Sequence, residues 1–138
     1  MFRFMTRGKS RRLAAFHADV LVLAADHTID HWADVLCVRY TYPAGDGGAS
    51  TSRTGKLPLG PGGTATAILV FVERRTGLTY IIAASDIADV MPASGVQWRR
   101  DGPSDAEIDR LIQFAVFGKV YYAKPPLTSS SASSSMVV

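Results

Sequence analysis

The sequence has one cysteine and no long hydrophobic run, and each shortage excludes a class of protein. The single cysteine, Cys37, cannot form an internal disulfide, which excludes a disulfide-stapled secreted framework and predicts a cytoplasmic protein. No apolar run approaches the roughly 18 residues that a membrane-spanning helix requires, so we expect no membrane partner. A secretory signal is disfavoured as well, because His17 and Asp19 interrupt the apolar residues of 13–25.

Acidic residues are missing from the first eighteen positions, where the sequence is strongly basic. The cations of this segment are Arg3, Arg7, Lys9, Arg11 and Arg12. Because the chain has a formal net charge of +3 and this segment carries +5, the rest of the chain carries −2. Such an asymmetry is typical of proteins that bind a polyanion. We predict a flexible basic arm over residues 1–10. The same composition also occurs in mitochondrial presequences, an alternative that the sequence leaves open.

The overall composition is that of one folded domain with a short tail. Hydrophobic residues make up 47% of the chain and charged residues 20%, and 138 residues suffice to bury one core. We predict a single domain over residues 11–125. The Ser-rich residues 126–138 offer too few large apolar side chains to pack, and we expect them to form a disordered tail.

The first half of the domain is predicted to contain two helices followed by a strand. Residues 11–25 carry apolar residues at helical spacing, with a strand over 19–24 as the alternative. Residues 27–36 show an apolar stripe at positions i, i+3, i+4 and i+7, which predicts an amphipathic helix. The stripe consists of Ile29, Trp32, Ala33 and Leu36. Residues 35–42 then alternate in character as a strand does.

The clearest unit in the sequence is a β-hairpin. Two β-rich runs, 64–73 and 78–84, flank a short loop that ends in Gly77, a residue suited to a positive φ angle. Both faces of residues 67–72 are apolar, so we expect a central strand that is covered on both sides.

A glycine-rich loop precedes the hairpin, and a capped helix follows it. Residues 43–63 hold seven of the twelve glycines and are predicted to be a loop, interrupted by a short strand near 52–57. Ser104 and Glu107 form the pattern of a capping box, which predicts that a helix begins there and covers residues 105–117.

These elements together predict an α+β fold. Residues 35–84 are expected to form a small, strongly bent antiparallel sheet or a partly open SH3-like barrel, packed by two or three helices that include 27–36 and 105–117. The side chains expected in the core are Trp32, Leu36, Val38, Ile68, Val70, Phe71, Ile81, Ile82, Leu111 and Ile112. Burial of each large side chain contributes about 1.5–3 kcal/mol before conformational entropy is subtracted.

Two of the three histidines lie in a compact acidic segment, residues 26–34. On a helix His27 and His31 would share a face, as two imidazoles that bind one Zn²⁺ do, and Asp30 or Asp34 could supply a third ligand. Against a metal site stands the lack of a second His or Cys pair to complete a tetrahedron. We therefore interpret the segment as a solvated helix face and keep a metal-dependent enzyme centred on residues 26–34 as the third functional hypothesis.

Other signatures of catalysis fail in detail. The glycine-rich residues 60–64 lack the GxxxxGK[ST] spacing of a phosphate-binding loop and precede a predicted strand instead of a helix. Cys37 is predicted to lie within a strand, where a lone cysteine behaves as a small apolar residue. No G-x-S-x-G motif is present. We therefore predict a protein that is not an enzyme and needs no cofactor.

Arginines stand in two pairs outside the basic segment. Arg74-Arg75 occupies the predicted hairpin tip, and Arg99-Arg100 directly follows Trp98. Clustered arginines beside an aromatic residue are typical of contacts with nucleic-acid phosphates and single strands. A simpler alternative is that each pair is only solvated loop charge. Together with the basic arm, the pairs favour a nucleic-acid-associated accessory or regulatory protein. A protein–protein interaction or assembly module, including a homo-oligomer, is the second hypothesis.

Overall fold

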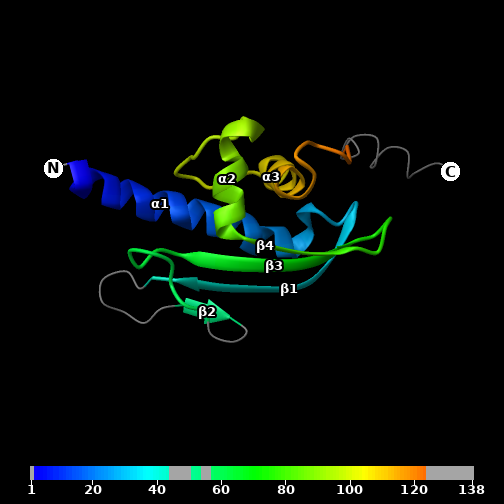
Figure 1. Ribbon diagram of the computed structural model, residues 1–138, viewed down its shortest axis with the longest axis horizontal. Helices are drawn as coiled ribbons and strands as arrows, with labels where there is room; N and C mark the ends of the chain where they lie inside the picture. Colours follow the sequence, from blue (N-terminus) through cyan, green and yellow to red (C-terminus); the bar gives the residue numbers. More distant parts are fainter. Residues whose placement is uncertain (1, 44–50, 54–56, 124–138) are drawn as a thin grey trace.

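Most of the chain is described by the computed structural model, which covers residues 2–43, 51–53 and 57–123 (Figure 1). For residues 2–10 and 51–53 it describes the backbone only. The predicted tail of residues 126–138 and part of the predicted glycine-rich loop lie outside the described residues. In chain order the elements are α1 (Phe2–Leu23), the π-helical turn η1 (Ala24–Thr28), β1 (Ala33–Tyr42), β2 (Thr51–Arg53), β3 (Thr66–Glu73), β4 (Thr79–Ala83), α2 (Ala84–Ser94) and α3 (Asp105–Phe117).

The fold has two layers, a sheet and a group of helices on one of its sides (Figure 1). All strand pairs are antiparallel, and the strands lie in the order β2-β1-β3-β4. The predicted α+β fold, with a small antiparallel sheet that is not closed, is therefore confirmed. No helix in the described ranges is long and apolar enough to cross a membrane.

The predicted hairpin is confirmed by the pairing of β3 with β4. Phe71 lies opposite Tyr80, and Leu69 lies opposite Ile82. Gly77 has φ +77°, a left-handed conformation that strains residues with a Cβ, and its N–H donates to the Glu73 carbonyl at 2.8 Å. The tight turn thus follows from local sequence, as the glycine position predicted.

Strand β3 is central, but helices cover only one of its faces. Its residues alternate between fully and half-buried, and the buried ones include Leu69 and Phe71. The other face carries Ile68 and Val70, which are half-buried, beside Ile81, which is 68% exposed. The expectation that both faces are covered is wrong for the described part of the chain, because all three helices lie on the same side (Figure 1). Ile68, Val70 and Ile81 are consequently outside the buried core.

The helix predicted for residues 27–36 is wrong. The π-helical turn ends at Thr28, and β1 already begins at Ala33. Only one helical turn lies between them, closed by the N–H groups of Trp32 and Ala33, which donate to the Ile29 carbonyl at 3.0 and 2.9 Å. That single turn is enough to bury Ile29 and Trp32, so these apolar side chains reach the core without a longer helix.

Leu36 leaves the predicted core because of a β-bulge. Val35 lies opposite Phe71 and Cys37 opposite Val70, so Leu36 is the extra residue between two neighbouring pairs. A bulge of this kind re-aims the side chains that flank it. Leu36 is 59% exposed, and Cys37 is exposed as well.

Helix α1 is longer than the sequence analysis predicted. It begins at Phe2, so the backbone of residues 2–10 is helical where we expected a flexible arm, and the strand alternative for 19–24 is wrong. The segment contains no proline, and Arg3, Met5, Arg7 and Lys9 are good helix formers, so Gly8 alone, at a cost of about 1 kcal/mol, does not interrupt it. Farther along, Phe16 and Val20 join the core that α1 shares with β3 and α2.

Helix α3 has the predicted boundaries and the predicted cap. The Glu107 N–H donates to Ser104 Oγ at 3.2 Å, and the Ser104 N–H donates to Glu107 Oε1 at 2.9 Å. These two bonds satisfy donors that a helix N-terminus otherwise leaves unpaired. The buried face includes Ile108, Leu111 and Ile112.

Candidate nucleic-acid interface

Arg74, at the hairpin tip, is bound within the protein. Its Nη2 donates to the carbonyl oxygens of Asp30 (2.7 Å) and Ala33 (3.1 Å) and to Asp34 Oδ1 (2.8 Å). The hydrogen bond from Arg74 lowers the pKa of Asp34, so this carboxylate stays ionised beside it. Arg74 therefore connects the hairpin to the start of β1, and most of its charge is already matched.

Arg75 is held by two tyrosines near the end of the described chain. Its guanidinium donates to the hydroxyl groups of Tyr121 (2.8 Å) and Tyr122 (3.2 Å) and lies 5.3 Å from the centre of the Tyr121 ring. The Tyr122 hydroxyl donates in turn to Glu73, which is buried and also accepts from Thr76 at 2.7 Å. The hydrogen bond from Tyr122 is the main reason why the pKa of Glu73 lies below its usual value.

His31 and Trp32 complete this corner by binding Asp109 on α3. The buried Asp109 carboxylate accepts from Trp32 Nε1 at 2.8 Å and from Gln113 at 3.1 Å, and it contacts His31 Nε2 at 3.0 Å. The stacked rings of Trp32 and Tyr122, with centroids 5.4 Å apart, lie in the same region and line a cavity of about 230 Å³ whose arginines are already bound. We use the name closed corner for the region formed by His31, Trp32, Glu73, Arg74, Arg75, Asp109, Gln113, Tyr121 and Tyr122.

The interpretation of residues 26–34 as a solvated helix face is wrong for His31. Only 16% of its side chain is exposed, whereas His27 is 65% exposed and lies 3.5 Å from the Asp105 carboxylate. Each histidine thus faces a different acid of α3, and Asp30 contributes its backbone carbonyl to Arg74. In the part of the chain that the structure describes, no three His, Cys, Asp or Glu side chains gather as metal ligands.

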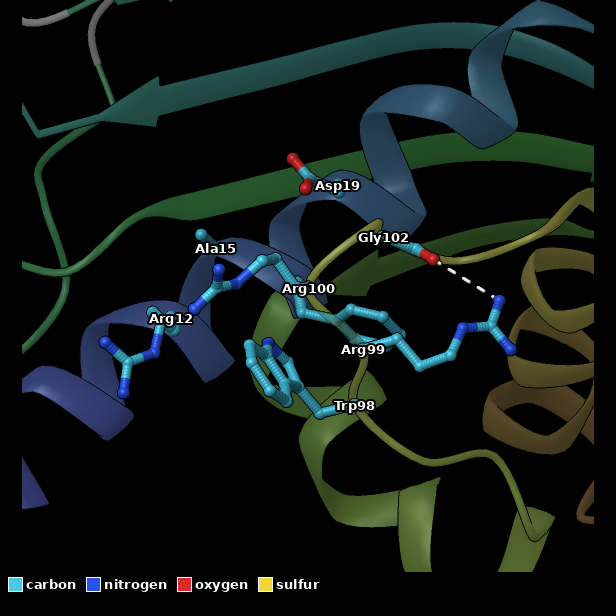
Figure 2. Close-up of a pocket in the computed structure, with 8 residues that line it drawn as sticks. Arg12, Ala15, Asp19, Trp98, Arg99, Arg100 and Gly102 are labelled. Atoms are coloured by element: carbon cyan, nitrogen blue, oxygen red, sulfur yellow. Dashed lines mark hydrogen bonds between the residues drawn. The ribbon is translucent and has the colours of Figure 1, made fainter.

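The second arginine pair has one bound member and one open member. Arg99 makes a two-point ion pair with Glu107, at 2.7 and 3.0 Å, and donates to the Gly102 carbonyl at 3.4 Å. Arg100 is exposed and makes no hydrogen bond or ion pair with any described residue. In Figure 2 the Arg99 side chain extends toward Gly102, away from the side on which Arg100 lies.

Arg100 meets Arg12 of helix α1 at a cavity of about 160 Å³. The two guanidinium groups extend to the same side of the 98–102 turn as the Trp98 ring (Figure 2). Ala15 and Phe16 of α1 supply the apolar part of the lining. Like Arg100, Arg12 is exposed and has no hydrogen-bonding or ionic partner among the described residues. We call the region formed by Arg12, Trp98 and Arg100 the open corner.

Two local features hold the open corner in shape. The 99–102 turn is closed by the Gly102 N–H, which donates to the Arg99 carbonyl at 3.1 Å, and Gly102 has φ +88°. On the α1 side, Asp19 lines the cavity and accepts from the Tyr42 hydroxyl at 2.5 Å. Burial raises the pKa of Asp19, while the hydrogen bond from Tyr42 opposes that change.

The structure divides the predicted binding residues between these two places. Arg12, Trp98, Arg99 and Arg100 line one cavity, whereas Arg74 and Arg75 line another with His31. Arg11 is exposed on α1, and the side chains of Arg3, Arg7 and Lys9 lie outside the described residues.

Sequence reasoning missed the partners of the closed corner. The available signal was on α3, where Asp109 and Gln113 stand one turn apart and next to Ile108 and Ile112 of the buried stripe. Polar residues on a buried helix face are nearly always hydrogen-bonded, so they indicate a network. Comparisons of this chain with protein-family models, with curated proteins and with solved structures found no match.

Proposed function

We propose that this protein binds nucleic acid through its phosphates, as a non-enzymatic accessory or regulatory protein. The observation that carries the proposal is the meeting of Arg12 and Arg100 at one cavity, from segments far apart in the sequence. Neither guanidinium is neutralised by a described residue, and Arg11 lies exposed on the same helix. Unpaired arginines on a surface are the groups that phosphate contacts require.

The charge distribution of α1 supports the same proposal. The first half of this helix carries all five cations of the basic segment, and its first turn has no acidic residue. A helix N-terminus already carries a partial positive charge, so cations there repel it and each other. A bound phosphate chain would offset that repulsion, which makes the basic end of α1 a favourable place for a polyanion.

The locations of His31 and Cys37 favour a non-enzymatic role. His31 is tied to Asp109 inside the closed corner. Cys37, whose oxidation state or nucleophilicity could otherwise matter, lies on β1 opposite Val70, on the sheet face that the helices do not cover. Neither group lines the cavity at the open corner.

A protein–protein interaction module is the second candidate, and the uncovered sheet face favours it. Ile81 is 68% exposed there, beside half-buried Ile68 and Val70, and Leu36 at the β-bulge is 59% exposed. Contiguous exposed apolar side chains are typical of interaction surfaces. Sedimentation over a wide range of protein concentrations, repeated with Ile81→Ser, tests whether this face binds a second copy.

The nucleic-acid proposal is tested by equilibrium binding of a labelled mixed-sequence oligonucleotide at several salt concentrations. Log K should fall with log[salt], and Arg12→Gln with Arg100→Gln should flatten the slope by roughly 0.9 per lost contact on duplex DNA. Lys119→Gln is the matched control, because Lys119 is an exposed cation beside Tyr121, at the other corner. Salt-independent binding, or equal losses in the control and the arginine variants, would contradict the proposal.

A further inference from the structure

We infer that the cavity of the open corner takes one unpaired pyrimidine nucleotide, with its base against Trp98 and its phosphate between Arg12 and Arg100. This inference rests on the proposed function, because it names the part of the nucleic acid that the same site would hold. It is argued from the size of the cavity, the state of the Trp98 ring and the distribution of charge around it.

The size of the cavity matches one six-membered ring. Its volume is about 160 Å³. An apolar protein cavity of about 150 Å³ accommodates benzene. A pyrimidine base therefore fits this space, whereas a purine would leave part of its fused ring system outside the apolar lining, because the cavity is open to solvent.

The Trp98 ring is available for stacking, which distinguishes it from the other tryptophan. Trp32 donates its N–H to Asp109 and is in contact with the rings of Phe71, Phe117 and Tyr122. Trp98 is half-buried at the cavity, and within the described ranges no other aromatic ring packs on it and its N–H has no acceptor. Stacking of one base on an aromatic side chain is worth between about 5-fold and about 100-fold in affinity.

The charges around the cavity set the orientation of the nucleotide. Asp19 lines the α1 side of the cavity and repels phosphate, while Arg12 and Arg100 attract it (Figure 2). The base consequently enters the apolar space beside Ala15 and Phe16, and the phosphate remains with the guanidinium groups. The ion pair between Arg99 and Glu107 anchors the turn that carries Trp98 and Arg100, so the two halves of the site keep their spacing.

An unpaired base is required because the space is recessed. The bases of a duplex are stacked and paired, and moving one out costs a few kcal/mol. A single strand presents its bases without that cost. The site therefore favours single-stranded over double-stranded nucleic acid, which phosphate contacts alone would not do.

The test compares labelled oligo-dT, oligo-dC, oligo-dA and a duplex of the same length at one fixed salt concentration. We expect the two pyrimidine strands to bind more tightly than oligo-dA, and the duplex to bind more weakly than either pyrimidine strand. Pyrimidine binding should also quench Trp98 fluorescence, a change that Trp98→Phe removes while Trp32 still reports the folded state.

Two variants separate stacking from electrostatics. Trp98→Ala should weaken oligo-dT binding by about 5-fold to 100-fold while the salt slope stays that of the wild type. Tyr121→Ala, which removes an exposed aromatic at the closed corner, is the control and should leave oligo-dT affinity unchanged. Circular dichroism checks the fold of each variant, and Trp98→Phe provides a milder change of the same ring.

The possible failures are distinct. Salt-dependent binding that is equal for oligo-dT, oligo-dA and duplex, and unaffected by Trp98→Ala, overturns the nucleotide site and leaves the proposed function in place. Loss of discrimination in Tyr121→Ala but not in Trp98→Ala overturns it as well, by moving the base to the other corner. Absence of salt-dependent binding to all four probes overturns the proposed function and this inference together.

Discussion

The two corners of the molecule are built from the same kind of sequence but differ in what their arginines do. At each corner a pair of adjacent arginines lies near a tryptophan. At the closed corner, Asp34 and the hydroxyls of Tyr121 and Tyr122 occupy both guanidinium groups. At the open corner, Glu107 occupies Arg99 only, and Arg100 meets a second unneutralised cation, Arg12. The acids and hydroxyls that the fold brings to an arginine pair therefore decide whether its guanidinium groups are bound within the protein or stay available to a ligand.

The tryptophans show the same contrast. Trp32 is 2% exposed and bonded to a buried carboxylate, so it contributes to stability. Trp98 is half-buried, packs against the edge of the core and lines a cavity, where none of the described residues accepts from its N–H. Substitutions at the closed corner should therefore act mainly on stability, and substitutions at the open corner mainly on binding.

The largest effect is expected from Asp109→Ala at the closed corner. The change leaves the N–H groups of Trp32 and Gln113 without their buried acceptor and removes the partner of His31. Each buried donor left unpaired costs about 1–3 kcal/mol, so we expect a loss of about 3 kcal/mol in the free energy of unfolding, measured by urea denaturation. Asp105→Ala, on the same helix but exposed beside His27, is the control and should change stability by less than about 0.5 kcal/mol. Equal losses in both variants would show that the network does not carry stability.

Glu107→Ala should have a smaller effect on stability, and it should lower the affinity for nucleic acid although it makes the protein more positively charged. Glu107 accepts from Ser104 in the capping box and anchors Arg99, so its loss should destabilise the protein by about 1–2 kcal/mol. The variant gains one positive charge, yet its affinity for oligo-dT should fall several-fold because the turn with Trp98 and Arg100 is released. Glu107→Gln can still accept from the Ser104 N–H, so its stability and its oligo-dT affinity should lie between those of the wild type and those of Glu107→Ala. If the oligo-dT affinity of Glu107→Ala rises instead, as net charge alone would predict, binding does not depend on the position of the turn that carries Trp98 and Arg100.

Arg74→Ala and Arg100→Ala compare the two corners directly. Removal of Arg74 breaks its bonds to two carbonyl groups and to Asp34, and we expect a measurable loss of stability with little change in binding. Arg100→Ala should alter stability by less than about 0.5 kcal/mol while it weakens nucleic-acid binding and flattens its salt dependence. Thermal melting and salt titration of both variants measure the contrast. If the two variants show the same melting temperature and the same salt dependence of binding, the two corners do not differ in function.

The smallest effect is a pH dependence that belongs to the closed corner. The hydrogen bond from Tyr122 lowers the pKa of Glu73 below 4.5, so the folded protein holds this group ionised more strongly than the unfolded chain does. Its contribution to stability is therefore complete above about pH 4.5 and is lost as the pH falls through the lower pKa of the folded state. Urea midpoints of the wild type should drop between pH 6 and pH 3, and those of Glu73→Gln should drop less. If the two pH profiles run parallel, Glu73 is not the group that titrates.

Two predictions that depended on turn and cap signals are confirmed by the structure. The hairpin followed from β-rich runs around Gly77, and α3 followed from the capping pair Ser104 and Glu107. Both signals act between residues a few positions apart, and their physical basis is the backbone conformation and the hydrogen bonds of a single turn. The helix predicted over 27–36 failed for a related reason, since a stripe of apolar residues is equally satisfied by one turn followed by a bulged strand.

The sequence by itself determined the α+β class, the hairpin, the cap of α3 and the basic character of the first eighteen residues, because these depend on local conformation and composition. Only the tertiary structure decided which cations are neutralised. Arg75 is held by Tyr121 and Tyr122, and Arg12 meets Arg100, through contacts between segments that no local pattern relates. It also decided that one apolar face of β3 lies uncovered by the helices, because the direction in which a chain returns over a sheet is set by the packing of whole elements.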